Sequence, residues 1–256
     1  MPAPTSRRSP ASADRSRPGR ALIGTSGFAY PGWSPRFYPP GLRAPDLLPY
    51  YSRRLDAVEL NNTFYQQPSE SKVTAWIAST PPEFRFTVKA QRGGSYRALA
   101  GDPTASVPWL TEPYRRFGER LGTVLFRVPE GVGRDDDRLA RLLAAWPRDL
   151  PLTMEFQDGS WHVDETLHAL RSAGAALCAT DLPDAPVPDL RRTADFLYLR
   201  LRRPDYGEAE LAAWAERLRP FLDAGDDVFV FFRHDEVGRG GELALDLRRR
   251  LESATD

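Results

Sequence analysis

The sequence predicts a single α/β domain of the (β/α)8 barrel class, the TIM barrel, and three observations support this. Eight short apolar runs recur along the chain, and most of them end in polar side chains. Segments with helical patterning separate them, and this alternation is typical of a parallel sheet with helical crossovers. The 256 residues suit one such barrel, with no break in composition after residue 20. A doubly wound sheet is disfavoured, because no glycine-rich dinucleotide loop joins the first run to a helix.

One strand is expected for each apolar run. In a TIM barrel the carboxyl ends of all the strands meet on the active face. The polar residues that end the runs therefore predict where a site lies. The expected strands cover residues 21–26, 57–62, 84–89, 123–127, 152–155, 175–181, 196–200 and 228–233.

Helices are expected between most of these strands. Ser69 is a suitable N-cap for a helix that begins at 68–69, and the acidic residues at 135–137 and 164–165 suit helix N-termini. The other expected helices cover residues 45–55, 113–121, 136–146, 164–173, 208–222 and 241–251.

Three segments are expected to be irregular. Residues 27–41 are rich in Gly, Pro and aromatic side chains and should fold over the active face. Residues 91–107 contain Gly93-Gly94 and Pro103, which favour a loop. Residues 182–193 are too proline-rich for a long helix.

Composition narrows the function classes. The 35 Lys and Arg residues balance the 35 Asp and Glu residues, which argues against nonspecific nucleic-acid binding by the whole surface. The lone Cys178 lies in an expected strand, where burial suits it, and it fits a cytoplasmic protein without internal disulfides.

The first 20 residues are rich in Pro, Ser, Ala and Arg, so we expect a disordered basic tail before a domain at 21–256. Nucleic-acid binding is left open for residues 1–20 alone. The tail lacks the apolar stretch of a signal peptide or membrane span, so no membrane partner is expected.

Four charged residues at or near strand ends are candidates for catalysis: Glu59, Lys89, Glu155 and Asp181. Glu59 lies between two apolar residues, so its carboxylate would point into the barrel and need a charged partner or a proton. It could act in the site or pair with a barrel arginine. Lys89 could bind an anion, transfer a proton or form a Schiff base, or it could pair with Glu59. Lys72 and Lys89 are the lysines of an otherwise arginine-based sequence, which favours a specific role for the compact ammonium of Lys89.

Arginines near the last two strand ends complete the candidate site. Arg200 and Arg202 are two residues apart and would face the same side of a strand, and Arg233 ends the eighth run. Many barrels bind phosphate at these strand ends, and a guanidinium pairs bidentately with phosphate or carboxylate. Alternatively, these arginines form a rim of ion pairs at the surface and bind no ligand. The residues expected to bind substrate are Asn61, Tyr65, Arg127, Arg200, Arg202, Arg233 and His234.

This set predicts a site for a small anionic ligand, such as a sugar phosphate or a carboxylate. Whether the protein is an enzyme is left open. If it is one, the expected chemistry is proton transfer, with Glu59 as base, Lys89 as its electrostatic or acid partner and the arginines as an anion clamp. No metal and no cofactor are expected, because no dedicated motif is present. Two alternatives stay open: a non-catalytic protein that binds a ligand or nucleic acid, and a metal-dependent hydrolase or isomerase that uses Glu59, Glu155, Asp181 and His234.

A set of short motifs lies along residues 22–250. They are Gly24-Thr-Ser-Gly27, Trp33, Phe37-Tyr-Pro39, Val58-Glu-Leu-Asn61, Thr63-Phe-Tyr65, Pro68, Trp76, Phe84-Arg-Phe-Thr-Val-Lys89, Glu155-Phe156, Ser160-Trp161 and Asp181. Together they resemble the DUF72 family, also called YecE-like, a group of TIM barrels with no established activity. The resemblance implies a barrel with a polar site at the strand ends.

The chain departs from that family pattern near the candidate site. Tyr96 and Arg202 stand where the resemblance leads us to expect histidines. Arg127 stands in place of a glutamine, Gln157 in place of an arginine, and Arg233-His234 in place of an asparagine pair. Acid–base chemistry through either histidine would therefore be lost or rebuilt in this chain.

Overall fold

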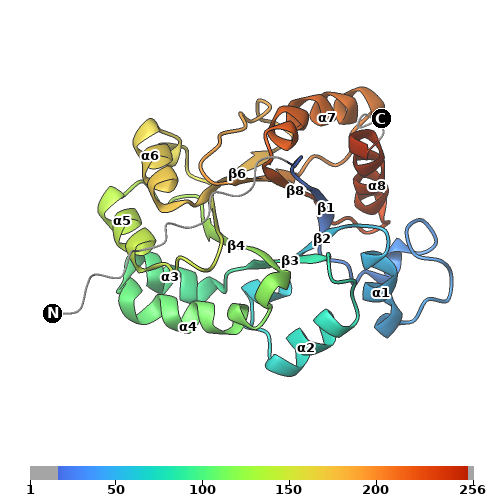
Figure 1. The fold of residues 1–256 in the computed structure, drawn as a ribbon, viewed down its shortest axis with the longest axis horizontal. Coiled ribbons are helices and arrows are strands. Elements are labelled where there is room, and N and C mark those ends of the chain that lie inside the picture. Colours follow the sequence, from blue (N-terminus) through green and yellow to red (C-terminus); the bar gives the residue numbers. More distant parts are fainter. Residues whose placement is uncertain (1–16, 253–256) are drawn as a thin grey trace.

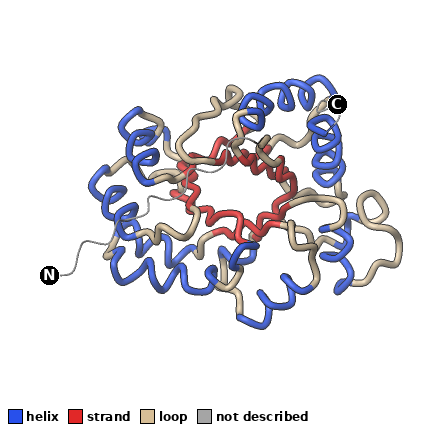
Figure 2. The backbone as a smooth tube through the Cα atoms, in the orientation of Figure 1, coloured by secondary structure: helices blue, strands red, loops and turns tan. Residues whose placement is uncertain are grey.

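A closed barrel of eight parallel strands forms the centre of the computed structural model, which describes residues 17–252. Neighbouring strands pair in chain order, and the last pairs with the first (Figure 1). The helices surround this ring on its outside (Figure 2). The predicted TIM barrel is confirmed. The strands are β1 (Ala21–Ser26), β2 (Ala57–Leu60), β3 (Arg85–Lys89), β4 (Leu121–Val128), β5 (Leu152–Phe156), β6 (Ala176–Asp181), β7 (Phe196–Leu201) and β8 (Asp227–Phe232).

Side chains along each strand alternate between two hydrophobic clusters. One cluster fills the barrel and includes Leu22, Tyr198 and the buried Cys178. The other lies between the barrel and the helices and includes Ile23 and Leu199. Because successive strand residues point to opposite sides, odd or even position decides which polar side chains enter the barrel.

Helices follow most strands, and several match their predicted bounds closely. Those expected at 136–146, 164–173, 208–222 and 241–251 are confirmed, whereas the one expected at 45–55 is shorter. Ser69 caps its helix as predicted, since its hydroxyl accepts the backbone N–H of Lys72 at 3.3 Å. The helices are α1 (Leu47–Ser52), α2 (Glu70–Ala78), α3 (Arg92–Ala100), α4 (Pro103–Arg115), α5 (Asp136–Ala145), α6 (Asp164–Ala173), α7 (Glu208–Asp223) and α8 (Arg239–Glu252).

The loop predicted over residues 91–107 is wrong, because α3 and α4 meet there. Gln91 caps α3, and its side-chain oxygen accepts the N–H of Gly94 at 2.7 Å. A Cβ on Gly94 would come within 2.8 Å of both Leu110 and Trp109 of α4. This glycine therefore permits a close approach of two helices, and it does not mark a loop.

α4 also begins earlier than predicted. Asp102 caps it by accepting the N–H of Thr104 at 2.8 Å, and Pro103 occupies the first turn, where its missing N–H has no intrahelical partner to lose. The helix expected over 113–121 is therefore misplaced, since α4 ends at Arg115 and β4 begins at Leu121.

The long segment after β1 is irregular, as predicted, apart from one short 3-10 turn at Pro31–Trp33. Its side chains Trp33, Phe37 and Tyr38 are buried, and the Trp33 indole donates to the carbonyl of Asp235 at 2.7 Å. This contact joins the segment to the residues that follow β8. The proline-rich segment 182–193 forms no helix, also as predicted.

The described chain enters the barrel just before β1. Residues 1–16 of the predicted tail lie outside the described residues. The N–H of Gly19 donates to the carbonyl of Leu222 at 2.7 Å, and that of Arg20 donates to Asp227 at 2.8 Å. Residues 19 and 20 are therefore joined to α7 and β8.

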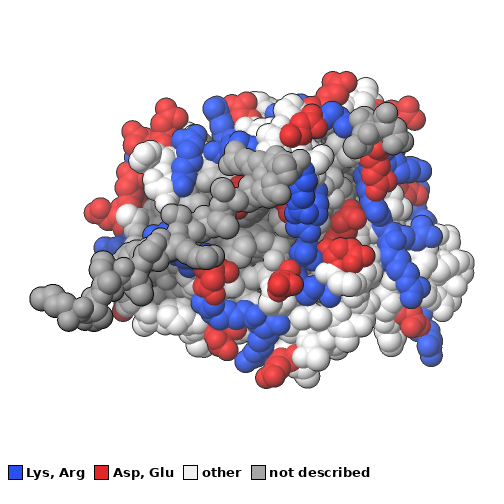
Figure 3. All heavy atoms as spheres, viewed as in Figure 1, with Lys and Arg blue, Asp and Glu red and all other residues white. Residues whose placement is uncertain are grey.

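The surface carries both signs of charge. Basic and acidic side chains are interspersed on the face shown in Figure 3, in keeping with the zero net charge. Between residues 17 and 252, none of the helices has the length and apolar character needed to cross a membrane.

Candidate functional site

Glu59 lies at the centre of a polar cluster at the carboxyl ends of the strands. Its side chain is fully buried, and both of its oxygens accept hydrogen bonds. Oε1 accepts from Ser26 at 2.7 Å, Arg200 at 2.8 Å and Arg202 at 3.2 Å, and Oε2 accepts from the Tyr198 hydroxyl at 2.7 Å. Ser26 lies beside Glu59 in the β1–β2 register, and the other three donors occupy alternate positions along β7 and just beyond it. These donors stabilise a carboxylate that has no contact with water.

Arg200 connects Glu59 to a second buried carboxylate. It donates to Glu155 Oε1 at 2.5 Å, and Arg127 Nε lies 3.3 Å from the other oxygen of Glu155. Arg127 and Glu155 are register partners on β4 and β5. Burial opposes the charge of Arg200, but the two glutamates raise its pKa above the ordinary value, so it stays protonated. The pairing of Glu59 with a barrel arginine, which the sequence left open, is therefore present.

Lys89 lies at the same end of the barrel, which we call the mouth, and it has no carboxylate partner among the described residues. It follows Thr87, the register partner of Glu59, by two residues and so faces the same side. Its side chain is buried, and its Nζ lies 4.4 Å from the centre of the Phe64 ring. Burial and the neighbouring Arg200 lower the pKa of Lys89, and Glu59 only partly opposes them. No ion pair joins Lys89 to Glu59 within the described chain, so the pairing considered for them does not form.

The mouth carries more positive than negative charge. Four cationic side chains meet two carboxylates there, which leaves an excess of two positive charges. Two of the cations remain partly accessible, since the Arg127 side chain is 31% exposed and that of Arg202 is 16% exposed. Solvent therefore reaches these two guanidinium groups, whereas Arg200 and Glu59 lie buried beneath them.

Aromatic side chains line part of the rim. Tyr30 stacks on His234 with ring centres 5.1 Å apart, and its hydroxyl donates to the carbonyl of Ser26 at 3.0 Å. Burial raises the pKa of Tyr30, while a hydrogen bond with the Asn61 side chain opposes the rise. Asn61 and His234 therefore lie at the rim, where each of them contacts Tyr30. Arg233 is exposed, and its guanidinium meets the carbonyl of Arg202 at 3.5 Å.

Two predicted site residues lie apart from the cluster. Asp181 is fully buried, but it pairs in register with Leu201 of the outer cluster, so its side chain faces the helices. It accepts from Arg203 at 3.0 Å and from Tyr206 at 3.0 Å. Tyr65 is 77% exposed and contacts Phe64 edge-on.

The four residues considered for a metal site do not converge. Glu59 and Glu155 are bound to arginines, Asp181 is on the outer side, and His234 is stacked on Tyr30. Within residues 17–252, no cluster of three or more His, Cys, Asp or Glu side chains has the arrangement of a metal site.

Ser26, Tyr198 and Phe64 belong to the site but were not predicted to act there. Tyr198 precedes Arg200 by two residues, so the alternation that placed Arg200 in the barrel also places Tyr198 there. Ser26 ends the first apolar run and could have been found by the same rule as Glu59. The contact of Phe64 with Lys89 depends on a 3-10 turn, Asn62–Phe64, that no sequence pattern indicated.

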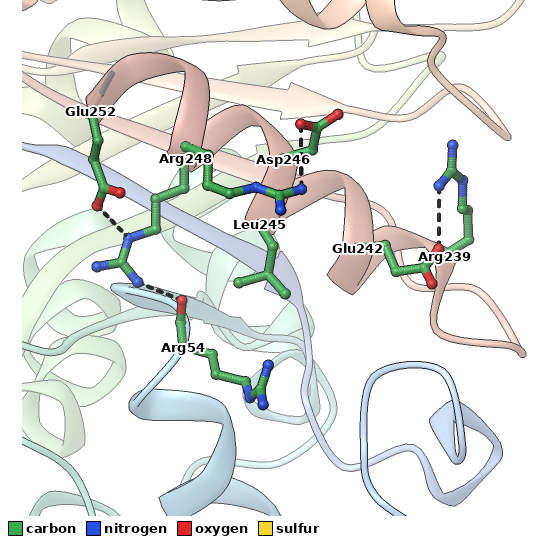
Figure 4. Close-up of a pocket in the computed structure, with 8 residues that line it drawn as sticks. Arg54, Arg239, Glu242, Leu245, Asp246, Arg248 and Glu252 are labelled. Carbon is green, nitrogen blue, oxygen red and sulfur yellow. Dashed lines mark hydrogen bonds and ion pairs between the residues drawn. The ribbon is translucent and has the colours of Figure 1, made fainter. Parts of the chain in front are cut away.

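Two cavities lie away from the carboxyl ends of the strands. One of about 630 Å3 is at the amino ends of the strands, beside Arg20 and Asp56. Another of about 600 Å3 lies along α8, where Arg248 donates to Glu252 and to the carbonyl of Arg54 (Figure 4). Arg239 pairs with Glu242 in the same pocket. These side chains are paired with one another, so we place the candidate site at the mouth.

The closed barrel and its charged mouth define a TIM-barrel protein whose candidate site is built on the carboxyl ends of its strands. The chain belongs to the DUF72 family, because the family model described as "Protein of unknown function DUF72" matches residues 22–256. The resemblance inferred from the sequence motifs is thereby confirmed.

Relatives extend over nearly the whole chain. The UPF0759 protein YunF of Bacillus subtilis is 26% identical to this chain over an alignment 270 residues long. The alignment covers 86% of this chain and 92% of that protein. The crystal structure of a DUF72 family protein from Thermotoga maritima is similar, with a TM-score of 0.79, 27% identity, and coverage of 91% of this chain and 99% of that one. A DUF72 family protein from Enterococcus faecalis has a TM-score of 0.73 at 21% identity, with coverage of 91% and 98%, and supports the fold.

Proposed function

We propose that the barrel mouth binds a small anionic ligand, a sugar phosphate or a carboxylate. The observation that carries this proposal is the excess of cationic over carboxylate side chains around Glu59. In a partly desolvated mouth, such an excess favours an incoming anion more strongly than it would in water. Among these four cations, Lys89 is the one with no carboxylate partner within the described chain, and it is the first ligand-binding group.

Arg202 and Arg127 complete the anion site in this proposal. Both are partly exposed, and each keeps donors beyond those it directs at a glutamate. A guanidinium can offer two parallel N–H groups to a phosphate or carboxylate. Glu59 is then a positioning residue, because its oxygens already accept from Ser26, Tyr198 and the arginines.

If the site moves a proton, Lys89 is the group best suited to carry it. Burial and Arg200 lower the pKa of Lys89, which is the direction that favours the free amine of a catalytic lysine. The buried Glu59 has no free face toward solvent. The base role first considered for Glu59 therefore passes to Lys89 in this proposal.

Ligand-induced shifts in melting temperature and calorimetric titration test the proposal. The probes are inorganic phosphate, glycerol 3-phosphate and lactate. Lys89→Met and Arg202→Gln should each weaken binding roughly tenfold to hundredfold, the usual loss for one charge-assisted contact. Arg148→Gln is the matched control, since Arg148 is exposed at the opposite end of the barrel. Equal binding by wild type and Lys89→Met would refute the assignment of the site.

A further inference from the structure

We infer that Lys89 forms an imine with a small anionic carbonyl compound, either a 2-oxo acid or a phosphorylated aldehyde or ketone. This inference rests on the proposed function, because the anionic group of the substrate would occupy the arginine part of the same mouth. It adds a covalent step that anion binding alone does not require.

The position of Lys89 supports this assignment. The residue ends β3 on the face that leads into the barrel, and 9% of its surface remains exposed. Its Nζ makes no hydrogen bond or ion pair within residues 17–252, so no carboxylate has to be displaced before it reacts. The Phe64 ring closes one side of the amine. A lysine that is desolvated and set beside other cations is the usual form of an amine nucleophile.

The choice of lysine at this position supports the same conclusion. Of the 35 Lys and Arg residues, all but Lys72 and Lys89 are arginines. A guanidinium binds phosphate or carboxylate at least as well as an ammonium, and it never loses its proton in a protein. A lysine amine offers a nucleophilic lone pair that arginine lacks. Nucleophilic chemistry therefore explains a lysine here better than anion binding alone does.

The step balances without a further reactant. The ammonium of Lys89 first releases a proton, and the free amine attacks the carbonyl carbon to give a carbinolamine. The hydroxyl of that adduct leaves as water after it takes up a proton, and a C=N bond replaces the C=O bond. The ammonium and the carbonyl compound thus become a protonated imine and one water molecule, with no change in total charge.

Reductive trapping tests the inference on the full chain. Sodium borohydride is added with pyruvate or with dihydroxyacetone phosphate, and peptide mass spectrometry locates the secondary amine. Lys72 is an internal control, because it lies on the outer helix α2. We expect at least about tenfold more adduct on Lys89 than on Lys72, because only Lys89 lies among the arginines that would hold the anionic group, and one charge-assisted contact is usually worth at least that factor. Labelling of Lys89 no greater than that of Lys72 with either compound would overturn the inference.

Matched ligands separate this inference from the proposed function. Lactate and glycerol 3-phosphate carry the same anionic groups without a carbonyl, so they should compete with trapping and bind without forming an adduct. Lys89→Arg keeps the positive charge, so it should bind both ligands yet form no adduct at position 89. If both ligands bind but Lys89 is not trapped, the imine is refuted while anion binding stands. If Lys89 is trapped but neither ligand competes, the inference as stated is refuted, because the anionic group would then play no part.

Discussion

Glu59 and Lys89 share one barrel mouth, yet their surroundings differ. Glu59 accepts four hydrogen bonds and has no exposed surface. Lys89 has an aromatic ring on one side and cationic neighbours, with no ion pair in the described chain. Removing one partner of a paired buried charge is strongly destabilising, whereas an unpaired buried charge is itself a cost in stability. In the proposed function, Glu59 therefore supports the site, and Lys89 is the group that contacts the ligand.

Glu59→Gln should destabilise the protein strongly. The change removes the charge that faces Arg200 and Arg202 in the interior, and breaking a buried pair costs roughly 3–5 kcal/mol. The free energy of unfolding from urea titration measures the loss. Glu83→Gln is the control, because Glu83 is exposed and a surface change should stay within about 0.5 kcal/mol. Similar stability for the two variants would show that Glu59 is not the centre of the cluster.

Lys89→Met should leave stability unchanged or raise it. The ammonium of Lys89 is desolvated, so its pKa in the folded protein lies below the ordinary 10.5. The folded state therefore loses this proton at lower pH than the unfolded state does. The cost in stability of burying the charged Lys89 is fully present below the pKa that Lys89 has in the folded protein. It disappears as the pH rises toward 10.5.

The stability difference between wild type and Lys89→Met measures this effect. Wild type should gain stability relative to the variant as the pH rises toward 10.5. Urea titrations of both proteins across this range give the difference. A loss of several kcal/mol in Lys89→Met at neutral pH, on the order of that for a broken buried pair, would mean that Lys89 has a charged partner after all.

At the level of elements, strand β7 and the residue after it place three of the side chains that bind Glu59. β7 and the residue beyond it deliver Tyr198, Arg200 and Arg202 to one side because their spacing matches the strand period. Arg202 stands where the family resemblance leads us to expect a histidine, and its guanidinium binds Glu59 and Ser26. Arg202 thereby adds one positive charge to the mouth.

The contact of α3 with α4 gives a matched pair of variants. A Cβ at Gly94 would meet Leu110 and Trp109 at 2.8 Å, whereas one at Gly93 would meet side-chain ends at 3.4 Å. Gly94→Ala should therefore cost about 1–3 kcal/mol through overpacking. Gly93→Ala should be neutral or stabilise by up to about 1 kcal/mol, since alanine is the better helix former. Thermal melts of the two proteins check this, and equal melting temperatures would mean that α3 and α4 pack more loosely.

At the scale of the whole molecule, the two ends of the barrel have different roles. The carboxyl ends of the strands hold the candidate site, as is usual for this fold, and the amino ends serve stability. Asp56 lies at the amino end of β2, 3.4 Å from Arg248 of α8. One of its carboxylate oxygens is buried without a hydrogen-bond partner within the described chain.

Asp56→Asn should stabilise the protein at neutral pH without affecting anion binding. Burial raises the pKa of Asp56 from 3.8 to about 6, and Arg248 opposes this only in part. The folded state then holds the proton more tightly, so wild-type stability should fall as the pH rises from about 4 through about 6. The variant should lack this fall and be more stable at pH 7 by on the order of 2 kcal/mol. A less stable variant at pH 7 would mean that the Arg248 pair outweighs the cost of burial.

The sequence determined the features that depend on short stretches of chain. Apolar runs and helical patterning predicted the barrel, and the polar ends of the runs located Glu59, Lys89, Glu155 and Arg200 at one end of it. These follow from local periodicity and from the fixed direction of parallel strands. The pattern failed at α3 because Gly94 serves a contact with a different helix.

Only the tertiary structure decided which of these side chains meet. Asp181 ends a strand as Arg200 nearly does, but it is one residue out of phase with the barrel interior, so it binds Arg203 and Tyr206 outside the barrel. Lys89 lies next to the strand of Glu59, yet Glu59 is bound to arginines from β7 across the barrel. Contacts between distant segments set the register of the strands, the closure of the barrel and the choice among competing partners. Local patterns in a single sequence do not reveal these contacts.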